Sequence, residues 1–345
     1  MTKVTLLGID LAKNIFQLHG VNQEGLKPLK KKVKREQLME FIANYPASTI
    51  VMEACSGSSY WAREFKKLGH EAKLISPQFV KPFVKTNKTD ANDAEAIVIA
   101  ARQEEMRFVP INGEEEQDIQ SIHRMRERLV GERTALINQI RGLLSEYGIV
   151  AAQGTSSIKK LLAEIEGDTE GEIKITSQMK ELCAEFYDEL KDKEKRIKKC
   201  DIKIEAIANT NPVCLNFMSV LGVGALTSTI LLTVLSNPSL FKNGRHFAAF
   251  LGLVPRQYSS GGKHKLYGIS KRGDKYIRSL LVHGARSVLM HAKKKTDKYS
   301  QWANKLNDRA GHNRTCVAIA NKNARILWAL AANVAEYKAD YKKSA

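Results

Sequence analysis

The chain of 345 residues has few cysteines, no pattern typical of a signal peptide and no clear membrane-spanning segment. Its five cysteines are widely scattered and none belongs to a Cys-x-x-Cys pair. This argues against a disulfide framework or a structural zinc site and favours a reducing cytoplasm. The first residues do not have the architecture of a signal peptide.

The longest uncharged stretch, residues 206–241, is not a convincing membrane span. Asparagine, glycine and proline interrupt it, so no clean apolar run of about 20 residues remains. We expect buried helices there and no membrane partner. Aromatic residues are also sparse, at 7%, so the composition does not indicate base stacking as a mode of nucleic-acid recognition.

Acidic residues are missing from one long segment, since residues 206–273 contain neither aspartate nor glutamate. This segment therefore cannot form a carboxylate metal site of its own. The whole chain has 55 Lys and Arg against 37 Asp and Glu, a net charge of +18. Such an excess favours a polyanionic partner, because each neutralised phosphate releases condensed counterions.

The N-terminal third has the pattern of a mixed α/β domain. Apolar, β-branched runs predict strands that alternate with helically spaced segments, with antiparallel strands first. The predicted strands are residues 3–9, 15–21, 27–34, 48–53 and 72–75, and the predicted helices are residues 35–45 and 58–68.

The middle of the chain changes to long helices with a narrow apolar stripe. One begins near Glu115, a polar break follows at residues 151–157, and a second continues through Ile207. Two such helices predict an extended antiparallel hairpin or coiled coil, with plain bundle packing as the alternative. From Pro212 the chain is predicted to be helical and basic, and the Gly-Val-Gly at 222–224 is typical of a phosphate-binding helical hairpin or of a packing turn.

Four carboxylates stand at positions where they can meet. Asp10 and Glu53 each end a predicted strand, and Asp90 and Asp93 share one side of a first helical turn. Carboxylates without supporting His or Cys predict Mg²⁺ or Mn²⁺, and two such ions ~4 Å apart suit phosphodiester chemistry. The alternative is that Asp90 caps the helix and Asp93 only favours its dipole.

A serine doublet lies in the acid-free segment. Ser259 and Ser260 precede two glycines on a predicted flexible loop, where a hydroxyl could attack phosphorus. The basic residues around it are candidates for holding nucleic acid: Arg256, Lys263, Lys271 and Arg272. The alternative is that Ser-Ser-Gly-Gly is only a turn between two elements.

Several motifs, in this order along nearly the whole chain, resemble the DEDD transposases of the bacterial insertion sequence 110 and 1111 family, which are relatives of Piv-type DNA invertases. These motifs are Gly8-Ile-Asp-Leu-Ala-Lys, Met52-Glu-Ala, Thr89-Asp-Ala-Asn-Asp-Ala, Gly252-Leu-Val-Pro-Arg with Ser-Ser-Gly-Gly, and Ile269-Ser-Lys-Arg-Gly-Asp. All four acidic positions of the family pattern are present.

The resemblance implies an α/β plus all-α chain with three domains. Residues 1–112 would form an RNase H-like (RuvC-like) domain, residues 113–210 a coiled-coil helical insertion, and residues 211–345 a helical transposase domain. It also implies that Asp10, Glu53, Asp90 and Asp93 are the metal ligands. The serine beside the glycine pair, Ser260, would attack DNA and form a phosphoserine intermediate, with Ser259 as the alternative nucleophile.

The function implied is RNA-guided DNA recombination for insertion-sequence mobility in the bacterial cytoplasm, associated with the nucleoid. The implied partners are double-stranded donor and target DNA, a guide (bridge or seeker) RNA, and further copies of the chain in a dimer or tetramer. The charge and the carboxylates fit equally well a metal-dependent nuclease of the Holliday-junction type without a serine–DNA intermediate. A third possibility is a non-enzymatic nucleic-acid scaffold or RNA chaperone, which would use the charge and the coiled-coil arm alone.

Overall fold

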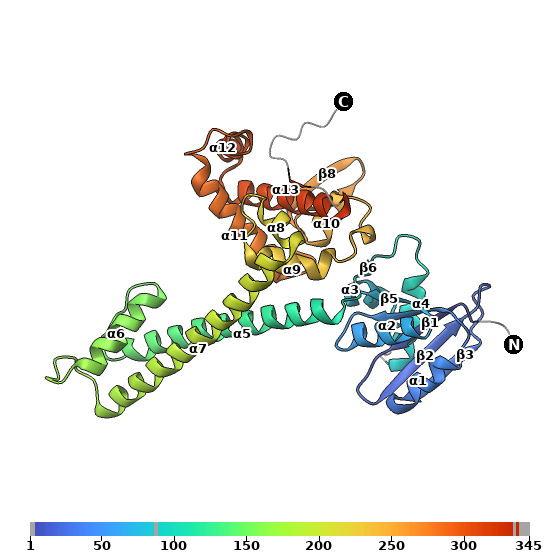
Figure 1. Cartoon of the computed structure of the whole chain (residues 1–345), viewed down its shortest axis with the longest axis horizontal. Helices are drawn as coiled ribbons and strands as arrows, with labels where there is room; N and C mark the ends of the chain where they lie inside the picture. The colour runs from blue at the N-terminus through green and yellow to red at the C-terminus, as the bar shows by residue number, and fades with distance from the viewer. Residues whose placement is uncertain (1–3, 86–88, 334–335, 338–345) are drawn as a thin grey trace. The chain divides into compact units, whose positions relative to one another are not determined.

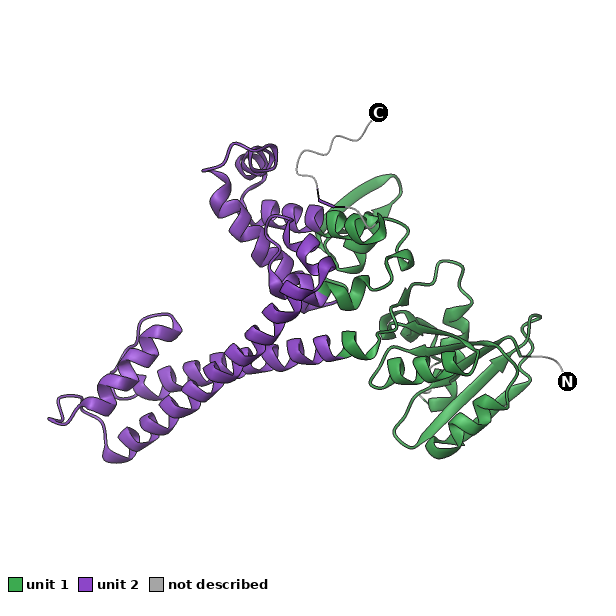
Figure 2. Cartoon of the chain, in the orientation of Figure 1, with its two compact units in different colours: residues 1–117, 231–273, 324–335 green, residues 118–230, 274–323, 336–345 purple. Residues whose placement is uncertain are grey.

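The computed structural model describes residues 4–85, 89–333 and 336–337. The chain forms two compact units, coloured separately in Figure 2. The first unit contains residues up to 117 together with 231–273 and 324–335, and the second contains 118–230, 274–323 and the C-terminal residues from 336.

The first unit contains a mixed sheet with strand order β3-β2-β1-β4-β5-β6. Strands β1 to β3 pair antiparallel, β1, β4 and β5 pair parallel, and β6 is antiparallel to β5. The bounds are β1 Leu6–Asp10, β2 Ile15–Val21, β3 Leu29–Lys34, β4 Thr49–Glu53, β5 Glu71–Ile75 and β6 Phe108–Val109. The predicted mixed α/β class is confirmed, and the five predicted strands lie within three residues of the observed ones.

Helices cover both faces of this sheet because its central strands are apolar on both sides. Side chains of β1 and β4 alternate between two separate cores: Ile9 and Met52 share one with α1 and α2, whereas Val51 shares the other with α4. The bounds are α1 Arg35–Ala43, α2 Ser58–Lys67, α3 Pro77–Val80, the short 3₁₀ turn η1 Lys81–Phe83 and α4 Asp90–Ala101.

Helix α4 lies unusually close to β1, and Gly8 makes this approach feasible. A Cβ atom at Gly8 would lie 2.6 Å from Val98 Cγ2 and 2.7 Å from the Ala94 carbonyl oxygen. Any larger residue would therefore push α4 away from the strand. The Gly8-Ile-Asp10 sequence thus brings the first turn of α4 beside the end of β1.

The second unit is built on two long antiparallel helices, drawn from green to yellow in Figure 1. Helix α5 spans Glu114–Ser145 and α7 spans Ser177–Thr210. Leu129 of α5 packs with Ile197 and Cys200 of α7, while the C-terminal part of α5 shares a core with the N-terminal part of α7 and with α6. Helix α6, Thr155–Gly167, begins inside the predicted polar break at 151–157, so that prediction holds only for the residues before it.

The described residues from 212 to 333 form helices and one β-hairpin. These elements are α8 Pro212–Met218, α9 Ala225–Leu235, η2 Pro238–Leu240, α10 Gly244–Phe250, β7 Pro255–Ser260, β8 Lys263–Ile269, α11 Lys275–Ala292, α12 Lys298–Ala310 and α13 His312–Asn333. Within the described ranges, no helix is both long enough and apolar enough to cross a membrane.

Gly222, the first glycine of the Gly-Val-Gly turn, has a packing role. Its backbone adopts φ +84°, and a Cβ atom would lie 2.7 Å from the carbonyl oxygen of Gly284 on α11. Conversely, a Cβ atom at Gly284 would lie 1.9 Å from the Gly222 carbonyl oxygen. The two glycines therefore let the turn and α11 touch through their backbones, as the packing alternative predicts.

A buried histidine joins three helices of the second unit. His123 of α5 is 1% exposed, and its Nε2 lies 2.9 Å from Thr229 Oγ1 of α9 and its Nδ1 lies 3.0 Å from the Tyr276 hydroxyl of α11. Because the Thr229 hydroxyl donates to the Ala225 carbonyl oxygen, Nε2 is the ring nitrogen that donates and Nδ1 accepts from Tyr276. Burial lowers the pKa of His123 to about 4.

The second unit should therefore lose stability as the pH falls from 7 to 5. The unfolded chain binds a proton at His123 near its ordinary pKa, while the folded chain does not, so the free energy of unfolding drops by about 2 kcal/mol over that range. Urea unfolding at both pH values measures the drop, and His123→Gln should reduce it. A matched control is the exposed His283→Gln variant; equal pH dependence in all three proteins would contradict the assignment.

Candidate active site

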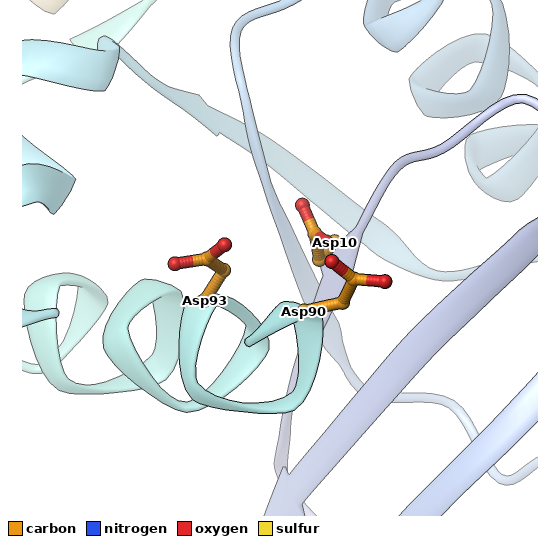
Figure 3. A group of neighbouring side chains, drawn as sticks. All are labelled: Asp10, Asp90 and Asp93. Atoms are coloured by element: carbon orange, nitrogen blue, oxygen red, sulfur yellow. The ribbon is translucent and has the colours of Figure 1, made fainter. Parts of the chain in front are cut away.

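Three aspartates gather at the carboxyl end of β1 (Figure 3). Asp10 is the last residue of β1, and Asp90 and Asp93 belong to the first turn of α4. Each offers a carboxylate oxygen, and these oxygens all lie within 4.8 Å of one another. The cluster opens to solvent, because Asp90 is exposed while Asp10 and Asp93 are half-buried.

The start of α4 explains why two of the aspartates face the third. Thr89 is the N-cap, and its hydroxyl accepts a hydrogen bond from the Asn92 amide at 3.3 Å. Asp90 is therefore not the capping residue that the alternative interpretation required. Helical geometry places Asp90 and Asp93 on one side, and the positive end of the helix dipole favours both charges there.

Glu53 ends the neighbouring strand on the same side of the sheet. The parallel pairing of Ile9 with Met52 puts Asp10 and Glu53 at adjacent strand ends, and alternation places Glu53 on the face that Val51 presents to α4. Burial raises the pKa of the Cys55 thiol, and the negative charges of Glu53 and Asp10 raise it further. The charges of both carboxylates therefore reach the Cys55 thiol, which shows that Glu53 and Asp10 lie near the same side chain. Glu53 does not belong to the cluster of three aspartates.

The donor set fits a hard divalent cation. All three clustered groups supply carboxylate oxygen, the ligand type that Mg²⁺ and Mn²⁺ prefer. Carboxylates this close repel one another when all are ionised, and a cation among them removes that repulsion. Asp10, Asp90 and Asp93 would hold the ion, with Glu53 at the adjacent strand end.

Sequence reasoning missed Glu95, a carboxylate that ties α4 to the rest of the first unit. Glu95 is 7% exposed and forms ion pairs with Lys27, in the segment before β3, and with Lys85, at 3.1 Å. The hydrogen bond from Lys27 is the main cause that lowers the pKa of Glu95 to about 2. Its only sequence signal is a charge among the alanines of an otherwise apolar helix face.

Glu95→Gln should destabilise the first unit by about 1 kcal/mol at pH 7, because it weakens two ion pairs whose lysine side chains are more than half exposed to solvent. Because the pKa of Glu95 is lower in the folded chain than in the unfolded chain, its ionised form stabilises the fold fully at pH values above 4.5. This contribution is lost as the pH falls toward 2. Thermal unfolding at pH 7 and pH 3 measures both effects. The exposed Glu105→Gln variant is the control, and equal melting temperatures for the two variants would refute the role of Glu95.

The serine doublet is on a β-strand rather than on the predicted flexible loop. Ser259 and Ser260 end β7, and Gly261 and Gly262 form the two-residue turn to β8 with φ values of +54° and +76°. Positive φ at both turn positions is what a tight hairpin of this twist requires, and glycine adopts it without strain. The glycines therefore serve the hairpin turn and present the doublet at its exposed tip.

The two serines lie on opposite faces of the hairpin. Ser259 pairs with His264 across the strands, and its Oγ lies 3.1 Å from His264 Nδ1 and accepts a hydrogen bond from Gln257 at 2.8 Å. Ser260 pairs with Lys263. Only one of the two hydroxyls can therefore face a ligand that approaches a given side of the hairpin.

The basic residues predicted to hold nucleic acid fall into two groups. Arg256 and Lys263 are exposed on the hairpin, whereas Lys271 and Arg272 are exposed in the segment that follows β8. That segment packs tightly, because a Cβ atom at Gly252 would lie 2.0 Å from the Arg272 carbonyl oxygen. Among the described residues, Lys271 is the one non-glycine residue with positive φ, at +55°. The surrounding structure must stabilise this uncommon conformation.

Comparison with known proteins identifies relatives over almost the whole chain. A family model for the transposase IS116/IS110/IS902 family matches residues 214–301, and a model for the DEDD transposases of IS110 type matches residues 7–149. The chain is 44% identical to the transposase for insertion sequence element IS1111A of Coxiella burnetii, over 98% of this chain and 92% of that protein. It is 45% identical to a probable family 20 transposase of Pseudomonas aeruginosa, over 94% and 96%. The pilin gene-inverting protein of Moraxella lacunata is 24% identical over 80% of each chain.

Proposed function

Since the chain belongs to the IS116/IS110/IS902 family of transposases, whose members cleave and recombine DNA, we propose that it is a metal-dependent, RNA-guided DNA recombinase that uses Ser260 as nucleophile. Membership of the family makes DNA the substrate and implies a divalent metal. The identity of the ion, the serine intermediate and the guide are parts of the proposal.

The observation that supports the proposal best is the cluster of Asp10, Asp90 and Asp93, whose ligand oxygens lie within 4.8 Å. A bound pair of Mg²⁺ or Mn²⁺ ions would supply Lewis acidity to the oxygens of a scissile phosphate. The protein's own part is to hold the aspartates together: Gly8 admits α4 beside β1, Thr89 caps its first turn, and Glu95 ties it to the lysines.

Ser260 suits the nucleophilic role better than Ser259. The Ser259 hydroxyl already contacts Gln257 and His264 through hydrogen bonds. Ser260 lies next to the hairpin turn and pairs with Lys263 across the strands. The Ser260 oxygen would form a bond to phosphorus as the bond to the 3′ oxygen breaks, and its proton would pass to the departing 3′ oxygen. One phosphodiester replaces another, so the reverse attack reseals exchanged strands.

The proposal also includes a guide RNA and an assembly of two or four copies of the chain. Its domains would be an RNase H-like domain of residues 1–112, a helical arm of residues 113–210 and a serine-bearing domain of residues 211–345. The net charge of +18 supports a chain that binds several nucleic-acid strands. Sequencing of RNA that co-purifies with the chain tests the guide. A defined transcript supports it, whereas bulk cellular RNA counts against it.

A metal-only nuclease of the Holliday-junction type is the second candidate, since the aspartate cluster forms without help from the hairpin. The two candidates differ in one product. Incubating the chain with Mg²⁺, the co-purified RNA and DNA, followed by denaturing electrophoresis, reveals a covalent protein–DNA species for the recombinase. Cleaved DNA without that species would favour the nuclease.

A further inference from the structure

The β7–β8 hairpin has no core of its own. Every residue of β7 and all of β8 before Ile269 are exposed, and among the described residues the two strands form a sheet of their own. An isolated two-stranded hairpin gains little stability from its own contacts in water. Such an element is therefore suited to lie against another molecule.

The base of the hairpin is nevertheless held firmly. The Ser270 amide donates to the Val254 carbonyl oxygen at 2.7 Å, and the Lys271 amide donates to the Gly252 carbonyl oxygen at 3.2 Å. Gly273 allows a similarly close approach, since a Cβ atom there would lie 2.0 Å from the Phe250 carbonyl oxygen. The hairpin thus projects from a fixed base, shown around the β8 label in Figure 1.

The two faces of the hairpin differ in chemistry. The pairs Ser260–Lys263 and Tyr258–Lys265, together with Tyr267, occupy what we call the Ser260 face, because directly paired residues of an antiparallel ladder share a face. Tyr258 is 68% exposed and Tyr267 is 45% exposed, and the Lys265 ammonium lies 5.3 Å from the Tyr267 ring.

The opposite face is less charged and partly satisfied internally. It carries Gln257, Ser259, His264 and Leu266, and three of these are linked through the Ser259 hydroxyl. Among the described residues, no ion pair involves Lys263 or Lys265. The cations of the Ser260 face are thus available to an anionic ligand.

We propose that the Ser260 face is a duplex-DNA contact surface, with Lys263 and Lys265 on backbone phosphates and the hydroxyls of Tyr258 and Tyr267 on phosphate or sugar oxygens. A two-stranded ribbon fits the major groove of B-DNA, and phosphate contacts from Lys and Tyr fix the position of a protein on the duplex. This inference rests on the proposed function, because it would hold the Ser260 hydroxyl at the DNA backbone.

The test moves charge from one face to the other at constant net charge. Lys263→Gln with Lys265→Gln removes two cations from the Ser260 face, and adding Gln257→Lys and Leu266→Lys restores them on the opposite face. Binding of the full chain to a fluorescein-labelled random-sequence DNA duplex, and to an RNA duplex of the same sequence, is followed by anisotropy at several salt concentrations. The hairpin residues pack in no core, and circular dichroism confirms the fold of each variant.

The double variant should lose about tenfold or more in DNA affinity, and the slope of log K against log[salt] should fall by about 2. The charge-transfer variant should not recover either quantity, and Tyr258→Ala with Tyr267→Ala should weaken DNA binding further. Unchanged DNA affinity, full recovery on charge transfer, or a loss confined to RNA would each overturn the proposal. Failure of the serine chemistry would appear separately, as intact DNA binding without a covalent species.

Discussion

Ser260→Ala should eliminate the covalent protein–DNA species and lower strand exchange by about 10³-fold or more, because no other group can replace the attacking oxygen. Ser259→Ala should retain the species, since its hydroxyl lies on the other face with Gln257 and His264. Denaturing electrophoresis of labelled DNA with each variant measures the difference. The aspartate cluster is untouched in both, so metal binding should remain equal.

The two single variants together also decide between the serines. A covalent species that persists in Ser260→Ala and disappears in Ser259→Ala would transfer the role to the serine that contacts His264 Nδ1 at 3.1 Å. A species that persists in both single variants would mean that either serine can attack or that another side chain does, and the Ser259→Ala, Ser260→Ala double variant separates these two outcomes. Ser260→Cys serves as the conservative variant, because a thiolate at the same position can still attack phosphorus.

Asp10→Asn should have the second large effect, with opposite consequences for activity and stability. Strand cleavage should fall by about 10³-fold or more, since the ion would lose a ligand and with it the stabilisation of charge at phosphorus. In metal-free buffer the variant should melt at a higher temperature than the wild type, because one of three mutually repelling carboxylates is removed.

Melting curves with and without Mg²⁺ measure this effect independently of activity. Mg²⁺ should raise the melting temperature of the wild type, since a ligand that binds only the folded state stabilises it, and should raise that of Asp10→Asn much less. Glu53→Gln tests the fourth carboxylate in the same way, and the exposed Glu104→Gln variant is the control. An equal Mg²⁺ response in all of these proteins would rule out the site.

Much of the first unit could be predicted because its information is local. Runs of β-branched residues predict β1, β2 and β4 within a few residues of their observed ends. A polar residue that ends an apolar run marks Asp10 and Glu53 as strand-end carboxylates, and helical spacing alone puts Asp90 and Asp93 on one side. The order of these motifs along the chain also suffices to predict the family, which the comparisons confirm.

Pairing between distant segments could not be predicted in the same way. Nothing local to Glu95 indicates that its partners are Lys27 and Lys85, and nothing in Ser-Ser-Gly-Gly distinguishes a loop from the end of a strand. A helix such as α6 also escapes a search for long stripes, because it is short and follows a polar segment.

The sequence by itself determined which side chains can do chemistry and which of them are neighbours along one strand or helix, since those relations depend only on backbone period. The tertiary structure alone decided that α4 lies against β1 through Gly8, so that Asp10 meets Asp90 and Asp93. It also decided which serine shares a face with Lys263. Both are matters of packing and register, which depend on the shapes of segments far apart in the chain.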